Sequence, residues 1–167
     1  ERAVRLAVEA LVTRNDALTE AVKHADDILD RFEVEIDERA VGLLSRAPLA
    51  SDLRLVTVAM KISQNLERVG DEATKIAKRV VLLNSEPPLK LRMDITGLAE
   101  QALTLLKEAL DTFSKRDPVR ARQLILLDKP IDELNRRIHQ QLVETMLADA
   151  STIVRCLHMM VVAKSLE

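Results

Sequence analysis

Aromatic residues are almost absent from this 167-residue chain, which has two Phe and neither Trp nor Tyr. A core therefore has to be built from Leu, Val, Ile, Ala and Met, which are the side chains of a helix bundle. Proteins that bind single-stranded nucleic acid stack its bases on aromatic rings, so the composition excludes a stacking platform of that kind. The formal net charge of −2 also gives no electrostatic footprint for DNA or RNA.

Cysteine is nearly absent as well. Cys156 is the single one, so no intramolecular disulfide can form, and this usage fits a reducing compartment. No apolar run approaches the roughly 20 residues that a membrane-spanning helix needs, and no secretory signal is visible. We therefore expect a cytoplasmic protein.

Glycine and proline are scarce, with 3 and 5 residues, and apolar residues recur at spacings of three and four almost throughout. This pattern predicts an all-α protein with helices at 1–13, 17–46, 51–83, 90–115, 118–148 and from 151 onward. Asp16 is predicted to cap the second helix and Pro48 to end it, and Pro130 predicts a bend in the fifth. The inward positions predicted for the first two helices are Val4, Ala7, Leu11, Val12, Leu18, Val22, Ala25, Leu29, Phe32 and Ile36.

The chain contains an internal repeat. Residues 26–36 match residues 128–138, and residues 51–67 match residues 151–167, with Leu66-Glu67 opposite Leu166-Glu167. We therefore expect a tandem pair of three-helix bundles, one unit at 1–86 and the other at 87–167. Because the sequence begins within a helical pattern and stops without a C-terminal cap, we also expect the outer helices to be truncated.

Acidic residues four positions apart recur at matching places in the two units. Two carboxylates at this spacing lie on one face of a helix and repel each other. If the helices pack antiparallel, four carboxylates can converge and attract a hard cation such as Fe³⁺, Mn²⁺, Mg²⁺ or Ca²⁺, and the set lacks the sulfur or imidazole that favours zinc. The alternative is that these pairs are solvated surface residues. The candidate metal ligands are Glu67, Asp71, Asp26, Asp30, Asp128, Asp132 and Glu167. Gly70 lies between two of them, where close helix packing explains it equally well.

Catalytic motifs are missing. The sequence has no Ser/His/Asp arrangement, no glycine-rich phosphate loop and no Cys-x-x-Cys, and its three histidines do not form the Glu-x-x-His set of di-iron oxidases. We therefore expect a protein that is not an enzyme. A helical protein that stores a metal or uses one in catalysis stays the alternative.

Two segments resemble the PhoU family of phosphate-signalling proteins. They are Ala47-Pro-Leu-Ala-Ser-Asp-Leu-Arg54 and Leu66-Glu-Arg-Val-Gly-Asp-Glu-Ala-Thr-Lys-Ile-Ala77, and the likeness extends over the duplicated three-helix layout. Members carry a Glu/Asp-x-x-x-Asp motif in each repeat, which Glu67 and Asp71 match. The second copy is present only as far as Glu167.

The resemblance implies a cytoplasmic, non-catalytic negative regulator of the phosphate-starvation response. Such a protein links a phosphate transporter of the ATP-binding-cassette type to a sensor histidine kinase. The resemblance also implies a homodimer and a multinuclear iron or zinc cluster on the acidic motifs, with manganese or magnesium as further options. The zinc cases oppose the ligand-hardness argument, so the residues leave the metal open.

Overall fold

Helices account for most of the chain in the computed structural model, which describes residues 1–46 and 49–167. Ala47 and Pro48, and with them the predicted helix end at Pro48, lie outside the described residues. The elements are α1 (Arg2–Thr13), α2 (Ala17–Leu44), α3 (Ala50–Asn84), α4 (Ile95–Ser114), α5 (Pro118–Leu124), α6 (Lys129–Ala148) and α7 (Ile153–Leu166), with 3₁₀ turns η1 (Ile125–Leu127) and η2 (Ala150–Thr152). Among the described residues there is no strand, so the all-α prediction is confirmed.

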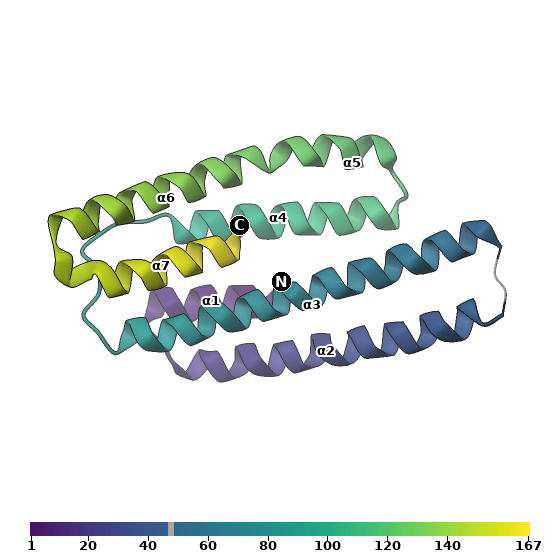
Figure 1. Cartoon of the computed structure of the whole chain (residues 1–167), viewed down its shortest axis with the longest axis horizontal. Helices are drawn as coiled ribbons and strands as arrows, with labels where there is room; N and C mark the ends of the chain where they lie inside the picture. Colours follow the sequence, from purple (N-terminus) through teal and green to yellow (C-terminus); the bar gives the residue numbers. More distant parts are fainter. Residues whose placement is uncertain (47–48) are drawn as a thin grey trace.

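The helices form two antiparallel groups (Figure 1). In the first group α1 packs against α2 and α3, which run side by side over their whole length. In the second group α4 contacts α5 and α6, and α7 lies against α6. Contacts of α7 with α3 and of α4 with α1 join the groups. The arrangement agrees with the predicted tandem of three-helix bundles.

One continuous aliphatic core runs through both groups. Its fully buried members come from every long helix except α5, and the largest are Ile76, Leu98, Ile138, Leu142, Val22, Val80 and Val162. Cys156 is buried in the same core. The stripe predictions were wrong at two positions, because Val12 is 62% exposed and Phe32 55% exposed. Phe32 lies in the second half of α2, which is much longer than α1, and α2 packs along α3 (Figure 1).

The internal repeat is visible in the turns that follow α1 and α4. Arg14 and Arg116 are the two non-glycine residues with positive φ in the described part of the chain, at 54° and 53°. In each case the side chain of the next residue accepts from a backbone N–H at the start of the following helix: Asn15 Oδ1 accepts from Ala17 N, and Asp117 Oδ1 accepts from Val119 N. Asp16 is the N-cap residue of α2, as predicted, but its side chain makes no capping hydrogen bond and its carboxylate accepts from Asn84 Nδ2. The two turns are related by 102 positions.

Two helix boundaries also differ from the predictions. The helix predicted from residue 90 begins at Ile95, because Asp94 caps it by accepting from Gly97 N. The helix predicted at 118–148 is divided into α5, η1 and α6. Pro130 lies in the first turn of α6, where its missing N–H cannot donate to the turn before. Proline therefore separates two helices here rather than bending one. None of the helices in the described residues is both long and apolar enough to cross a bilayer.

Candidate functional site

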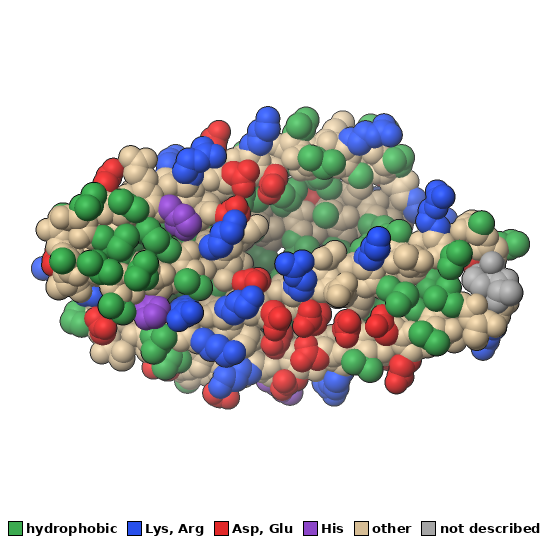
Figure 2. Space-filling view, in the orientation of Figure 1, with side chains coloured by type: hydrophobic (Ala, Val, Ile, Leu, Met, Phe, Trp, Pro, Cys, Tyr) green, Lys and Arg blue, Asp and Glu red, His purple; other side chains and the backbone are tan. Residues whose placement is uncertain are grey.

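Acidic side chains form a row over α2 and α3 (Figure 2). On α2 the spacing of Asp26, Asp30, Glu33 and Asp37 is four, three and four, which places all four on one face of the helix. Glu67 and Asp71 lie one turn apart on α3, which packs along α2. The row therefore combines the two predicted acid pairs of the first unit, and we call it the acidic face.

Asp26 is a partly buried member of the acidic face. Thr74 Oγ1 donates to Asp26 Oδ2 at 2.9 Å, whereas Asp26 Oδ1 is buried without a hydrogen-bond partner among the described residues. The space that Oδ1 occupies exists because position 70 is glycine: a Cβ there would overlap Oδ1 and would lie 2.7 Å from Leu29 Cδ1. Gly70 thus permits close packing of α2 on α3 and seats a carboxylate between them.

The carboxylates of the two helices influence one another's pKa values. Burial raises the pKa of Asp26, and the charges of Asp30 and Asp71 raise it further, against the opposing hydrogen bond from Thr74. Desolvation also raises the pKa of Glu67, with the charges of Asp71 and Asp30 adding to it. Because charges from both helices act on each group, the structure brings the four predicted carboxylates of the first unit together. A bound cation would reduce the repulsion between these carboxylates.

The carboxylates of the acidic face do not converge on a single point. Within residues 1–46 and 49–167, no group of three or more His, Cys, Asp or Glu side chains stands as a set that could hold an ion. The donor chemistry still fits a hard cation, because every ligand is a carboxylate and one oxygen of Asp26 has no partner.

The second unit pairs its acids differently. Glu167 accepts from the Asn135 amide and, at 2.8 Å, from Lys164 Nζ. The hydrogen bond to Glu167 and the charge of Glu167 raise the pKa of Lys164, and the charge of Asp132 adds a smaller contribution. Asp128 is exposed at the junction of η1 and α6, one helical turn before Asp132.

The repeat explains this difference between the units. Asn135 is the counterpart of Glu33 at a spacing of 102, and Lys164 is the counterpart of Gln64 at a spacing of 100. Glu67 therefore meets a carboxylate across the helix pair, whereas Glu167 meets an amide and an ammonium group. The first unit carries unbalanced negative charge, and the second neutralises its glutamate internally.

Sequence reasoning missed three participants. Glu33 raises the pKa of Glu67, Thr74 binds Asp26, and Asn135 binds Glu167. The continuation of the Asp26 and Asp30 spacing by three residues could have indicated Glu33. Nothing in the sequence ties Thr74 to Asp26, 48 positions away, because that contact depends on how α2 and α3 are aligned.

The fold and the site define a class: a duplicated three-helix bundle with an acidic face between the second and third helices of its first unit. The family model of the PhoU domain matches residues 1–80 and 95–167. The chain belongs to the PhoU family.

Relatives and solved structures agree with this assignment. The chain is 35% identical to the "Phosphate-specific transport system accessory protein PhoU homolog" of Aquifex aeolicus, over 100% of this chain and 76% of that protein. The chain is 38% identical to the homologue of the same name from Rhizobium meliloti, over 100% of this chain and 71% of that protein. The crystal structure of PhoU from Pseudomonas aeruginosa superposes with a TM-score of 0.91 at 34% identity, covering 99% of this chain and 80% of that one. A PhoU structure from Streptococcus pneumoniae shares the fold, with a TM-score of 0.87 at 22% identity, covering 99% of this chain and 78% of that one.

Proposed function

We propose that this protein is an accessory regulator of phosphate transport and phosphate homeostasis. The observation that carries the proposal is membership of the PhoU family across nearly the whole chain, with relatives 35% and 38% identical that are named phosphate-specific transport system accessory proteins. An accessory role also suits a helical bundle whose sequence carries no motif pairing a nucleophile with a base. The protein regulates by binding other proteins and is not an enzyme.

The partners we propose are a sensor histidine kinase and the ATPase subunit of a phosphate transporter of the ATP-binding-cassette type. Binding favours the state of the kinase that represses the phosphate-starvation response, so that the protein is a negative regulator. It acts in the cytoplasm as a homodimer and reaches the membrane only through its partners. The surface most suited to binding is formed by the second half of α2 and the first half of α3, which we call the projecting end. Its half-exposed aliphatic side chains include Val34, Val41, Leu43, Leu53 and Leu55.

The acidic face binds a cation in this proposal, as a structural or regulatory ligand. Asp26, Asp30, Glu67 and Asp71 would hold it in the first unit, and Asp128, Asp132 and Glu167 belong to the equivalent place in the second. The orphaned Asp26 Oδ1 supports this assignment, as do the raised pKa values of Asp26 and Glu67. A bound cation would screen the repulsion across α2 and α3 and so stabilise the pairing on which the projecting end depends.

Partner binding is tested by co-purification of the protein with the kinase and the transporter ATPase, in phosphate-rich medium, with and without chelator. We expect both partners to be recovered, and the yield to fall with chelator. Recovery of neither partner would overturn the regulatory proposal.

The cation is tested by elemental analysis and calorimetric titration with Mn²⁺ and Fe³⁺. Glu67→Gln with Asp71→Asn should lower the metal content, and should lower Tm only when metal is supplied. The matched control, Glu35→Gln with Glu38→Gln, removes the same charge from exposed positions of α2 and should change neither. Unchanged metal stoichiometry in the acidic-face variant would dismiss the site. Phosphatase or ferroxidase turnover that depends on Glu67 would favour the alternative of a metal-dependent enzyme.

A further inference from the structure

Aliphatic side chains gather on the outside of the hairpin that α6, η2 and α7 form (Figure 2). Leu147, at the end of α6, is 84% exposed, and four further exposed residues and the half-buried Val161 accompany it. We call this surface the hairpin patch. Its members are Val143 and Leu147 of α6 and Ile153, Val154, Leu157 and Val161 of α7.

The hairpin patch consists of two adjacent stripes. Its two members on α6 are four positions apart, and the last three on α7 are three and four positions apart, so each helix presents them on one face. His139, one turn before the α6 members, contacts the carbonyl oxygen of Met160 through Nε2 at 3.4 Å, which places the two faces next to each other. Neighbouring ridges of this kind leave a groove that the side chains of a third helix can enter.

The corresponding surface of the first unit is polar. At the spacings of the repeat, 102 positions for α6 and 100 for α7, four members of the hairpin patch have exposed polar counterparts. Ser45, Arg54, Thr57 and Lys61 stand in place of Leu147, Val154, Leu157 and Val161, in that order. The fold therefore does not require aliphatic residues on this face, and a contiguous exposed apolar surface is typical of a binding site.

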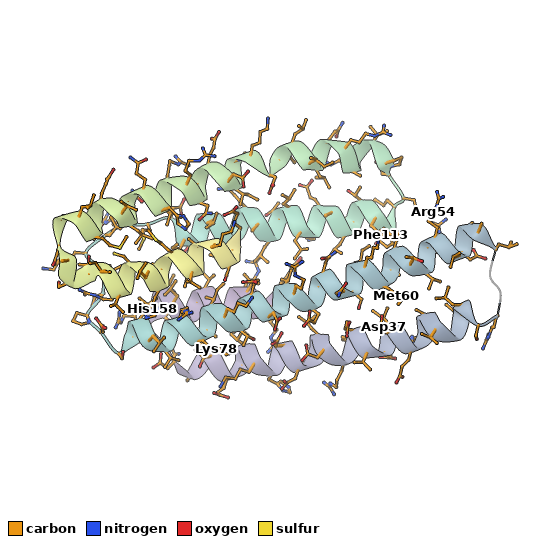
Figure 3. All side chains as sticks on the ribbon, viewed as in Figure 1. Asp37, Arg54, Met60, Lys78, Phe113 and His158 are labelled. Atoms are coloured by element: carbon orange, nitrogen blue, oxygen red, sulfur yellow. The ribbon has the colours of Figure 1, made fainter. Side chains whose placement is uncertain are left out.

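Cationic side chains flank the hairpin patch. Arg136 is exposed on α6, seven positions before Val143 and so on the same face. On the other side of the patch, Arg79 Nη1 of α3 lies 3.5 Å from His158 Nδ1 of α7. Figure 3 shows Lys78 and His158 on neighbouring stretches of these two helices. Within residues 1–46 and 49–167, no ion pair includes Arg136, Lys78 or Arg79.

Hydrogen bonds hold the tip of the hairpin in one geometry. Asp149 Oδ1 accepts from Ser151 N at 2.9 Å, and Thr152 Oγ1 donates to the carbonyl oxygen of Asp149 at 2.7 Å. Glu144, the other acidic residue near the tip, accepts from Gln140 Nε2 at 3.0 Å. A surface that is already ordered loses little conformational entropy when a partner binds it.

We propose that the hairpin patch is a docking surface for an acidic amphipathic helix of a partner protein. The inference rests on the proposed function, which requires partners, and adds a surface separate from the projecting end. Aliphatic side chains of the bound helix, three and four positions apart, would enter the groove. Its Asp and Glu side chains would face Arg136 on one side and Lys78 and Arg79 on the other.

Charge and composition favour this occupant over two others. A second copy bound by a two-fold contact would set the cations that flank the hairpin patch against one another, because such a contact uses the same surface on both copies. A membrane surface is usually bound through Trp, Phe and Leu beside Lys and Arg, whereas the hairpin patch consists of Val, Leu and Ile without an aromatic ring.

The experiment gives the hairpin patch two residues of its polar counterpart, through Leu147→Ser with Leu157→Thr. The control, Val119→Ser with Leu126→Thr, makes comparable changes at exposed positions of α5 and η1. A third variant, Arg79→Glu with Arg136→Glu, reverses the flanking charge. Circular dichroism checks the fold of each variant. If the patch variant does not fold, Leu147→Ser alone replaces it.

The probe is a fluorescein-labelled peptide of about 18 residues, with Leu on one helical face and Glu on the other. Its Kd is measured by fluorescence anisotropy. We expect the patch variant and the charge variant each to raise the Kd about tenfold or more, and the control to leave it unchanged. The same peptide with Lys in place of Glu should bind the unaltered protein about tenfold more weakly or worse. Equal Kd values for the unaltered protein and the patch variant would overturn the proposal.

The same variants then enter the co-purification with the kinase and the transporter ATPase. Loss of one partner from the patch variant alone, with the control retaining both, supports the docking surface. If the unaltered protein recovers neither partner, the regulatory proposal fails, and the peptide titration still decides on the hairpin patch.

Two further measurements identify the other occupants. A dimer that the patch variant loses in analytical ultracentrifugation would show that a second copy covers the surface. Sedimentation of the unaltered protein, but not of the patch variant, with vesicles of phosphatidylcholine and phosphatidylserine would show that a membrane does. Either result overturns the proposal.

Discussion

The carboxylate of Asp26 fills the space that a side chain at position 70 would take, so Asp26 and Gly70 are mutually dependent. Oδ1 of Asp26 lies against Gly70 without a hydrogen-bond partner among the described residues, and Oδ2 accepts from Thr74. A glycine in a helix interior costs roughly 0.5–1 kcal/mol relative to alanine. Here that cost permits the packing of α2 on α3 at the centre of the acidic face.

Gly70→Ala should destabilise the protein, because both Asp26 and Leu29 have to move away from the new methyl group. Gly42→Ala is the matched control: this glycine also lies within a helix, α2, and a Cβ added to it would meet nothing within 4 Å. Gly42→Ala should therefore raise the free energy of unfolding by about 0.5–1 kcal/mol. Urea unfolding measures the change in the free energy of unfolding for both variants. The double variant Asp26→Ala with Gly70→Ala should recover part of the loss, and an additive double variant would contradict the coupling.

Glu67→Gln should raise the free energy of unfolding at pH 7 in the presence of chelator. The pKa of Glu67 is raised in the folded protein above its ordinary value of 4.5. The folded state therefore binds the proton more tightly than the unfolded chain, and its stability falls as pH rises through this range. The gain from Glu67→Gln should shrink as pH falls through the raised pKa of Glu67 and should be lost below about 4.5. Unfolding curves at pH 3.5 and 7 test this, with Glu38→Gln as an exposed control. A gain that is equal at both pH values would contradict the electrostatic cause.

Arg14→Gly and Arg116→Gly should have opposite effects on stability. Both residues have positive φ, a conformation that costs a non-glycine residue about 1–2 kcal/mol, so glycine relieves strain at each. Arg14 Nη2 also donates to the carbonyl oxygens of Leu83, Asn84 and Glu86 at the end of α3. Arg116→Gly should therefore stabilise by up to about 1 kcal/mol, whereas Arg14→Gly should lower Tm. Calorimetry of the two variants tests the prediction, and a higher Tm for Arg14→Gly would refute the role of Arg14.

Asn135→Asp should destabilise the second unit by about 2 kcal/mol at neutral pH. The side chain is buried and its amide donates to Glu167. An ionised aspartate loses this donor and faces a second carboxylate, whereas a protonated one can donate again. The loss should therefore decrease as pH falls below about 5. Glu33→Gln makes the opposite change in the first unit and should stabilise at pH 7. Unfolding at pH 4 and 7 distinguishes this from a defect in packing, which would not depend on pH.

The local spacing of residues was sufficient to predict several features. Scarce glycine and proline with apolar residues three and four apart predict helices, because that spacing gives each helix one face to bury. The match of residues 51–67 to 151–167 predicts the duplication, and the pairs Asp26–Asp30 and Glu67–Asp71 share a helix face by geometry alone. Pro130 marked an interruption, although its consequence was a complete break between α5 and α6.

Tertiary packing decided the rest, because it joins residues far apart in the chain. The alignment of α2 on α3 places Thr74 on Asp26, adds Glu33 to the acidic face and leaves Asp26 Oδ1 without a partner among the described residues. Phe32 is 55% exposed in the second half of α2, a helix of 28 residues against the 12 of α1. The difference between the units at Glu33 and Asn135 has a meaning only once each is known to face Glu67 or Glu167. Periodicity along a helix fixes which side chains share a face, but only the neighbouring helix determines what that face meets.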